Sequence, residues 1–427
     1  MSFIREIKLA TTESIKALFV SRKMLVMFLL GFSSGLPLLL TMSTLTLWYA
    51  SYNVSIQEIG LLSLIAFPYT FKFLWAPLMD RFIPPFLGRR RGWILSMQAF
   101  MILLLMIISM YNPGEHPYFI AIIGVFICFV SASQDIAINA YQADILLEKE
   151  RALGSAVYVL GYRLAMFFSG TISLFIASYF NWNIAYFTMS IFMFIGILGV
   201  FLAPPTEDNE KYIPISLTKT TIHSFKEFFI RLNKKSALLI LFIIVFYKLG
   251  DALAFSLNSV FFLKGLNFSL IDIGIAFKTN AMIFSLIGSI MGGIIINRIG
   301  LYKGFLYFSL IMALANLMYL ALALIGKNYT MMAMSVAVEY FAGGLGTSAF
   351  VALLLSLCNK SYSATQFAIF SSIDSLGRVF IGPLAGFTVE NFNWPILFLL
   401  SFMIGIFTTI IIYLSKKSIC YMGNLKE

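Results

Sequence analysis

The stretch Asn53-Val-Ser-Ile-Gln-Glu-Ile-Gly60 occurs a second time, in altered form, as Asn267-Phe-Ser-Leu-Ile-Asp-Ile-Gly274. Each copy lies between two long apolar segments, and the segment after it ends in a charged turn that contains glycine. These turns are Asp80 to Arg91 in the first case and Asn297 to Gly304 in the second. The repeat predicts two equivalent halves, an arrangement typical of secondary transporters, with a substrate site between the halves.

The composition excludes an ordinary soluble domain. Hydrophobic residues make up 60% of the 427 residues, charged residues make up 11%, and the mean hydropathy is +0.91. A soluble domain has about a quarter of its residues charged. Segments of about 20 apolar residues can cross the hydrocarbon core as helices, and the short alternating strands of an outer-membrane barrel are missing from the sequence. We therefore predict an all-α membrane protein.

Twelve apolar segments predict twelve transmembrane helices in two pseudo-symmetric six-helix bundles. The predicted spans are 24–50, 59–79, 93–110, 118–143, 152–179, 184–203, 238–262, 273–296, 304–325, 331–358, 365–389 and 394–414. The predicted parts of the chain are an amphipathic arm at 1–23, a first bundle at 24–203, a linker at 204–236, a second bundle at 237–414 and a tail at 415–427.

The net charge of +11 follows from where the basic residues fall. Most Lys and Arg residues lie in the N-terminal arm, the even-numbered loops, the linker and the tail, and Lys264 and Lys327 are the exceptions in odd-numbered loops. This alternation predicts that both termini and the linker are cytoplasmic. We interpret the basicity as a topology pattern that also favours contact with anionic lipid, and not as nucleic-acid binding.

Histidine and cysteine usage gives no sign of metal or redox chemistry. His116 and His223 fall in loops, and Cys128, Cys358 and Cys420 are scattered along the chain. We predict no disulfide, no metal site and no cofactor. A membrane-embedded transferase is the less favoured alternative to a transporter, because such an enzyme needs a convergent nucleophile or base that the sequence lacks.

Ionisable residues inside the predicted spans are the main functional candidates. Each would cost about 2.5 to 3.5 kcal/mol at a lipid-facing helix centre, so we expect them to face an interior cavity or one another. They are Lys72, Asp135, Arg163, Lys248, Asp251, Lys278, Glu339, Asp374 and Arg378.

Two of these pairs have a spacing that places both groups on one helix face. Lys248 and Asp251 are three residues apart, and Asp374 and Arg378 are four apart. Each pair is interpreted either as a charge-neutral structural pair or as part of the transport machinery.

The other cations have no acid at helical spacing, which makes them better candidates for meeting an anionic substrate. They are Lys72, Arg163 and Lys278. A proton-coupling group must gain and lose a proton as its surroundings change. The available carboxylates are Asp135, Asp251, Glu339 and Asp374.

Glycine and proline are concentrated in two of the spans. The first span contains Gly35 and Pro37, and the tenth contains Gly343 and Gly344. These residues predict gating hinges, with tight helix contact as the alternative that we weigh slightly higher. We also expect the charged turn after the second span to take part in gating, through Asp80, Arg81, Arg89 and Arg90.

Several short segments, in order along the chain, form the pattern of a known family. They are Gly31 to Pro37, Pro68 to Leu78, Gly88 to Trp93, Ser133 to Ile136, Leu160 to Leu164, Tyr247 to Ala252, Gly343 to Leu354, Cys358 to Ser361, Ala364 to Ala368 and Gly377 to Val379. Through these segments the chain closely resembles the AmpG-type muropeptide permeases. Its charged turn at 80–91 resembles the inter-helix signature of the major facilitator superfamily.

The resemblance implies a major facilitator fold and a proton-driven importer of anhydro-muropeptides for cell-wall recycling, in the bacterial inner membrane, which we expect to be a monomer. The cavity residues of the family, carried over onto matching positions, are Lys72, Asp135, Arg163, Lys248, Asp251, Lys278, Glu339 and Arg378. Additional amide hydrogen bonds to the substrate can come from Gln134, Asn139 and Gln142.

The chain departs from the family pattern in two places. The family tends to have an acid where Asn139 stands and often a base where Gln142 stands, whereas both are neutral here. Asp374 is an acid where a small or neutral residue is expected. These departures keep open the alternative that the same fold carries another anionic solute, such as a nucleotide or a coenzyme A ester.

Overall fold

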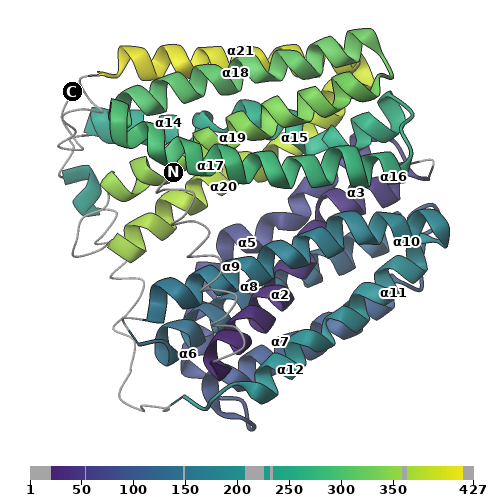
Figure 1. Cartoon of the computed structure of the whole chain (residues 1–427), viewed down its shortest axis with the longest axis vertical. Helices are drawn as coiled ribbons and strands as arrows, with labels where there is room; N and C mark the ends of the chain where they lie inside the picture. The colour runs from purple at the N-terminus through teal and green to yellow at the C-terminus, as the bar shows by residue number, and fades with distance from the viewer. Residues whose placement is uncertain are drawn as a thin grey trace, which may run out of the picture. The chain divides into compact units, whose positions relative to one another are not determined.

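The computed structural model of the chain describes residues 21–52, 54–147, 150–206, 226–230, 234–357 and 363–416, and their regular structure is helical throughout (Figure 1). Most of the predicted arm, linker and tail lies outside the described residues, as do His223, Cys358 and Cys420. Within the described residues the chain forms two compact units, one made of 21–48 and 71–206 and the other of 49–70 and 226–416. The predicted bundle boundaries differ from this division, which groups 49–70 with the C-terminal part of the chain.

The first unit consists of long helices joined by short turns. Its helices are α2 (Arg22–Thr41), the start of α3 (Ser43–Ala50), η2 (Lys72–Leu74), α6 (Ala76–Arg81), α7 (Gly88–Ile108), α8 (Pro117–Ile145), α9 (Arg151–Phe167), η4 (Phe168–Ile172), α10 (Ser173–Tyr179), α11 (Trp182–Phe192) and α12 (Phe194–Leu202). In a helix each backbone N–H and C=O group pairs within the helix, which matters in a membrane because hydrocarbon offers these groups no hydrogen-bond partners.

The second unit contains a segment from the first half of the sequence in addition to the C-terminal helices. Its helices are α4 (Ile56–Leu61), η1 (Leu62–Ala66), α5 (Phe67–Phe71), α14 (Lys234–Tyr247), α15 (Leu249–Val260), η5 (Phe261–Gly265), α16 (Leu270–Asp272), η6 (Ile273–Thr279), α17 (Asn280–Ile299), α18 (Leu301–Ile325), α19 (Tyr329–Leu357), α20 (Ser363–Phe392) and α21 (Trp394–Leu414). In Figure 1, α18 and α21 run side by side.

The repeated stretch forms the same local structure twice. Ser55 and Glu58 make a capping box at the start of α4, in which the Ser55 hydroxyl accepts from the Glu58 amide and the Glu58 carboxylate accepts from the Ser55 amide. Ser269 and Asp272 make the equivalent box at the start of α16. The repeat is therefore a helix-starting motif that satisfies two backbone donors each time.

Ten helical stretches among the described residues are long and apolar enough to cross a membrane, and each overlaps a predicted span. The predicted span 59–79 is helical but divided into short pieces, and it contains Pro68 and Pro77, which cannot donate backbone hydrogen bonds. The predicted span 365–389 lies inside α20, a 30-residue helix whose Asp374, Arg378 and small polar residues lower its hydropathy. All twelve predicted spans are thus helical, and ten meet the length and hydropathy of a membrane span.

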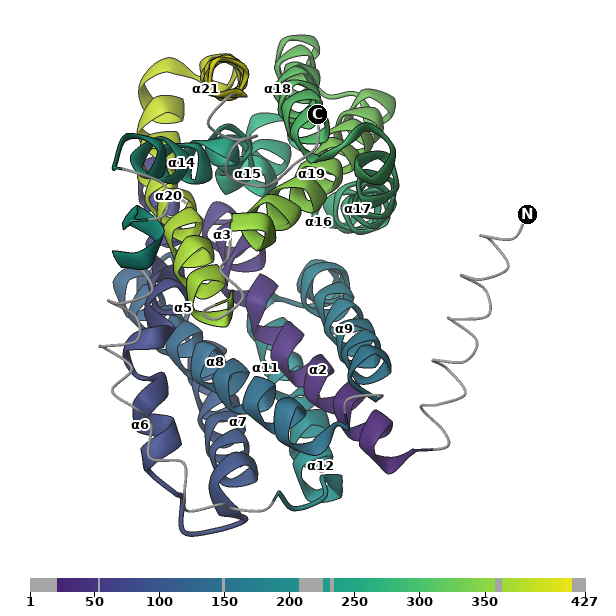
Figure 2. The ribbon, with the colours of Figure 1, turned by 90° about the vertical axis from the view of Figure 1, so that its left-hand side faces the viewer.

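Glycines bring helices into close contact within each unit. In the first unit, α2 runs beside α9 (Figure 2), and a Cβ at Gly35 would strike the backbone of Tyr162. In the second unit, α17 packs on α19, and a Cβ at Gly344 would strike the backbone of Ser285. Gly60 of α4 likewise meets Gly382 of α20. Small residues allow this close approach in membrane helices.

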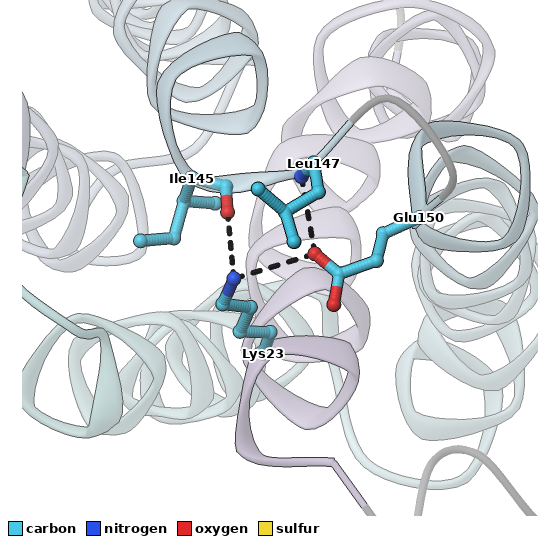
Figure 3. Close-up of polar contacts among 4 residues, drawn as sticks. All are labelled: Lys23, Ile145, Leu147 and Glu150. Carbon is cyan, nitrogen blue, oxygen red and sulfur yellow. Dashed lines mark hydrogen bonds and ion pairs between the residues drawn. The ribbon is translucent and has the colours of Figure 1, made fainter.

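The start of α2 is held to the turn between α8 and α9 by a small polar cluster (Figure 3). Lys23 Nζ donates to the Ile145 carbonyl at 3.0 Å and pairs with Glu150 Oε2 at 3.3 Å. The Leu147 amide also donates to Glu150, at 3.0 Å. The ammonium thus caps the C-terminal end of α8, where free carbonyls favour a cation.

Candidate functional site

Asp135 lies at the centre of the polar residues in the first unit. Its Oδ1 accepts a hydrogen bond of 2.5 Å from Ser34 Oγ of α2, and the Tyr158 hydroxyl of α9 donates to the same Ser34 Oγ at 2.8 Å. Lys72 is near enough for its charge to act on the Asp135 carboxylate. Three helices and the break in the predicted second span therefore contribute to one group of polar side chains.

Arg163 follows Tyr162 on α9 and is half-buried. Among the described residues no hydrogen bond or ion pair involves its guanidinium, as the sequence analysis expects for a cation without an acid at helical spacing. The Tyr158 and Tyr162 rings lie one helical turn apart, with centroids separated by 6.4 Å. This face of α9 thus presents two aromatic rings and an available cation.

The three amide residues predicted on α8 lie in different surroundings. Gln134 is fully buried, and its Nε2 donates to Ser33 Oγ at 3.2 Å. Asn139 is exposed, and Gln142 is half-buried with no described partner for its amide nitrogen. Among the three, Asn139 is therefore the one whose side chain is accessible to a solute, whereas the amide nitrogen of Gln142 is buried.

The predicted pairing of Lys248 with Asp251 is wrong in its geometry. Lys248 lies at the break between α14 and α15, with φ −106° and ψ 3°, and its carbonyl accepts the first helical hydrogen bond of α15, from the Ala252 amide at 2.9 Å. Its Nζ instead donates to Thr347 Oγ1 of α19 at 2.6 Å. Asp251 accepts from Asn316 Nδ2 of α18 at 3.3 Å. The Lys248 charge still acts on Asp251 across the space between them.

The predicted pairing of Asp374 with Arg378 is confirmed. Arg378 Nη2 lies 2.8 Å from Asp374 Oδ2 along α20. The two side chains differ in burial, because that of Asp374 is 5% exposed and that of Arg378 is 48% exposed. The charges of both act on Lys248. These residues and Asp251 form one charged group within the second unit.

Glu339 and Lys278 are the remaining ionisable residues of the second unit's spans. Glu339 is fully buried in α19, and no described residue donates a hydrogen bond to either of its carboxylate oxygens. Lys278 lies in the π-helical η6, where its Nζ donates to Ser259 Oγ at 3.1 Å and lies 4.5 Å from the centre of the Phe277 ring. A π-helical turn inside a membrane helix is frequent at functional sites.

The predicted gating residues are partly described. Arg90 pairs with Asp144 at 2.8 Å, which ties the start of α7 to the end of α8, and Arg89 is half-buried beside it. Asp80 and Arg81 belong to α6, but their side chains lie outside the description.

The glycines and the proline predicted as gating residues belong to uninterrupted helix. Pro37 lies inside α2, and Gly35 and Gly344 make the close helix contacts described above. Gly343 has open space around its Cα, with the Phe255 ring 4.0 Å from a Cβ placed there. Close contact thus accounts for two of these glycines, while Gly343 has room to accommodate a larger side chain.

Sequence reasoning missed the neutral partners of these charged residues. They are Ser34, Ser259, Asn316 and Thr347. Small polar residues are common in membrane helices, so their presence alone does not mark them as partners.

The comparisons with known proteins agree with this architecture. The family model for the Major Facilitator Superfamily matches residues 24–284 and 240–418. Among solved structures, the nucleoside transporter NupG superposes with a TM-score of 0.71 at 15% identity, covering 92% of this chain and 99% of that one. A POT family transporter in complex with 5-aminolevulinic acid superposes with a TM-score of 0.73 at 14% identity, covering 93% and 96%. At these identities the likeness shows the fold alone.

Curated relatives cover nearly the whole chain. The anhydromuropeptide permease of Escherichia coli (strain K12) is 39% identical over 397 residues, which are 93% of this chain and 80% of the relative. An uncharacterized protein of Haemophilus influenzae is 34% identical over 91% of this chain and 94% of its own length. A putative AmpG transporter of Rickettsia conorii is 30% identical over 94% and 99%. The chain therefore belongs to the Major Facilitator Superfamily and, within it, to the family of the AmpG-type muropeptide permeases.

Proposed function

We propose that this protein imports anhydro-muropeptides across the bacterial inner membrane by alternating access, driven by protons that enter with the cargo. The observation that carries the proposal is the 39% identity, along 93% of the chain, to a protein named anhydromuropeptide permease. Polar and charged side chains inside the spans of both units support it, since such residues mark transport pathways in membrane proteins.

The topology belongs to the same proposal. Twelve spans, with both termini in the cytoplasm, agree with the helical structure of all twelve predicted segments and with the distribution of Lys and Arg. The capping boxes at Ser55 and Ser269 support an internal duplication, because each begins the second predicted span of its half. We further propose that the working protein is a monomer.

The cationic side chains are assigned to the cargo. A muropeptide carries several carboxylates, which ammonium and guanidinium groups bind well in a site of low dielectric. The cations available in the spans are Lys72, Arg163, Lys248, Lys278 and Arg378. The exposed Asn139 supplies amide hydrogen bonds, the buried amide nitrogen of Gln142 would have to become accessible in another state of the transport cycle, and the buried Gln134 acts by holding Ser33 in place.

The carboxylates are assigned to the proton. Asp135, Asp251, Glu339 and Asp374 are the candidates, because all four lie in spans and a carboxylate there is easier to keep neutral than charged. Their partners differ: Asp135 accepts a hydrogen bond from the Ser34 hydroxyl, whereas Asp374 forms an ion pair with Arg378.

Uptake into proteoliposomes tests the function. Purified protein should accumulate labelled anhydro-muropeptide when a pH gradient, acidic outside, is imposed, and vesicles without a gradient should only equilibrate. No accumulation above the no-gradient control would reject the proposal.

A second cargo class is favoured by one observation. Asp374 pairs with Arg378, so the charge in this part of the second unit differs from the pattern of the muropeptide permeases, and a different arrangement of charge favours a different arrangement of anionic groups on the cargo. The alternative is the same transporter with a different anionic cargo, such as a nucleotide or a coenzyme A ester. Competition by unlabelled nucleotide or coenzyme A ester that exceeds competition by muropeptide would favour it.

A further inference from the structure

The carboxyl group of Glu339 has no partner in the described structure of the second unit. It lies in the middle of α19 with 0% of its surface exposed, and neither oxygen receives a hydrogen bond from a described residue. No ion pair joins Glu339 to a described cation, and the two lysines of this unit's spans donate to hydroxyls, Lys248 to Thr347 and Lys278 to Ser259. A buried polar group in this condition is expected to have a function.

Asp251 of α15 is close enough for its charge to act on Glu339. Asp251 accepts one hydrogen bond from the side-chain amide of Asn316 in α18, and the side-chain oxygen Oδ1 of Asn316 is itself buried without a described partner. The two tyrosines near Glu339 are Tyr319 of α18 and the adjacent Tyr340 of α19. Residues of three helices, α15, α18 and α19, thus meet around two buried carboxyl groups.

Other elements packed on α19 bring no second cation to this space. In α17 the charged residue is Arg298, in the last turn of the helix. In η6 it is Lys278, which is held by Ser259. From α20, Asp374 and Arg378 act on Lys248 and pair with each other. Lys248 is therefore the cation whose charge acts on Asp251, while Arg378 pairs with Asp374.

The two carboxyl groups cannot both be ionised at low cost. Two like charges in a medium of low dielectric repel each other, and an ionised carboxylate without donors is expensive to bury. With Glu339 added, the charged group formed by Lys248, Asp251, Asp374 and Arg378 contains two cations and three acids. One bound proton makes the group neutral, and Glu339 is the acid that lacks any other stabilisation.

We propose that Glu339 and Asp251 together form the proton-binding site of the transporter, and that Lys248 links this site to the anionic cargo. The proposal rests on the proposed function, and it names the site where the proton binds. A cargo carboxylate that takes the Lys248 ammonium leaves Asp251 without its cation, so Asp251 takes up a proton from water. The charge of the group stays balanced, because one negative charge and one proton arrive together. Binding of cargo and binding of proton then favour each other to the same degree.

The first test is independent of cargo. A neutral carboxylic acid has its own carbonyl band in the infrared spectrum, and purified protein at neutral pH should show a band that disappears in Glu339→Gln. The matched control is Glu390→Gln, at an exposed acid near the end of α20, which should leave the band in place. An identical band region in the parent and in Glu339→Gln would overturn the assignment of the proton.

The second test separates coupling from cargo binding. In proteoliposomes, Asp251→Asn removes the acid that takes up the proton when cargo binds, so this variant should lose accumulation driven by a pH gradient and keep exchange of labelled for unlabelled anhydro-muropeptide without a gradient. Accumulation at the parent's level would overturn the proposal, as would loss of both activities in a variant that elutes and melts like the parent. If Asp251→Asn does not fold, proton uptake decides: addition of anhydro-muropeptide to the purified parent in weakly buffered solution should raise the pH, and no change in pH would overturn the proposal.

The same vesicles identify the coupling ion. A sodium gradient without a pH gradient should drive no accumulation in the parent, and sodium-driven accumulation would overturn a proton site in favour of a sodium site. If the parent neither accumulates nor exchanges muropeptide, the proposed cargo is wrong. The infrared band then still confirms or overturns the proton-binding site.

Discussion

The ion pair between Asp374 and Arg378 should respond differently to the loss of each partner. Arg378 has a side chain that is 48% exposed, so water solvates its charge when the acid is removed. Asp374 is 5% exposed, so its carboxylate loses the one described ion pair that stabilises it when the arginine is removed. Asp374→Asn and Arg378→Gln therefore form a matched pair of substitutions in which the same 2.8 Å contact is broken from either side.

The magnitudes follow from the position of the pair between two limits. Exposed ion pairs contribute about 0.2 to 1 kcal/mol, whereas removing one partner of a buried pair costs about 3 to 5 kcal/mol. Asp374→Asn should cost at most about 1 kcal/mol of folding stability, because the remaining charge is solvated and screened. Arg378→Gln should cost about 3 kcal/mol, because the remaining charge is buried.

Cargo affinity should change in opposite directions for the two variants. Asp374 competes with cargo carboxylates for the Arg378 guanidinium, so Asp374→Asn should lower the Kd by about five-fold, which corresponds to about 1 kcal/mol. Arg378→Gln should raise it. The assay is thermal unfolding of purified protein together with competition for labelled anhydro-muropeptide in vesicles. Equal stability losses, or a weaker affinity in Asp374→Asn, would refute the reasoning.

Three further substitutions test the packing and the hydrogen bonds. Gly344→Val should destabilise the protein by about 1 to 3 kcal/mol, because the added side chain meets the backbone of α17, while Gly343→Ala, next to it in open space, should leave the melting temperature unchanged. Ser34→Ala should lower gradient-driven uptake by about ten-fold or more, because it removes the hydrogen bond from the Ser34 hydroxyl to the Asp135 carboxylate, and a hydrogen bond to a charged group contributes about 1.5 to 3 kcal/mol. The control is Ser33→Ala on the same helix, which leaves the hydrogen bond to Asp135 in place. Ser269→Ala should cost about 1 kcal/mol of unfolding free energy through loss of the helix cap, and an unchanged denaturation midpoint would contradict the role of the repeat as a capping box.

Most of the helices could be predicted from the sequence, because a membrane span is fixed by apolar length. Pro68 and Pro77 mark the second predicted span as one that can bend, and α5 and α6 each begin one residue before a proline, but the sequence does not show that α4 and η1 pack on α20. There the Ser63 hydroxyl donates to the Val379 carbonyl of α20 at 2.8 Å. Ser63 and Val379 are 316 residues apart, so no local sequence pattern predicts this contact.

The candidate site shows the same limit. Asp374 and Arg378 pair as their spacing predicts because α20 is continuous through both. Lys248 and Asp251 form no direct ion pair among the described residues, because the Lys248 ammonium donates to Thr347 of α19. Spacing along one helix predicts which side chains can meet, but it does not show which residue of another helix competes for one of them.

The duplicated chain uses one helix-starting motif twice but arranges charge differently in its two units. In the first unit, the carboxylate of Asp135 is held by a hydroxyl from Ser34, which in turn accepts from Tyr158. In the second, Asp374 is held by Arg378, and Asp251 by the amide of Asn316 within reach of the Lys248 charge. Asp135 in the first unit and Asp251 in the second each combine a neutral hydrogen-bond partner with the charge of a lysine, Lys72 and Lys248. An anionic cargo that attracts either lysine removes a positive charge from the neighbouring acid, so linkage between cargo charge and proton uptake is expected in both units. The direct ion pair of Asp374 with Arg378 belongs to the second unit, and there the cargo must compete with an acid for the cation.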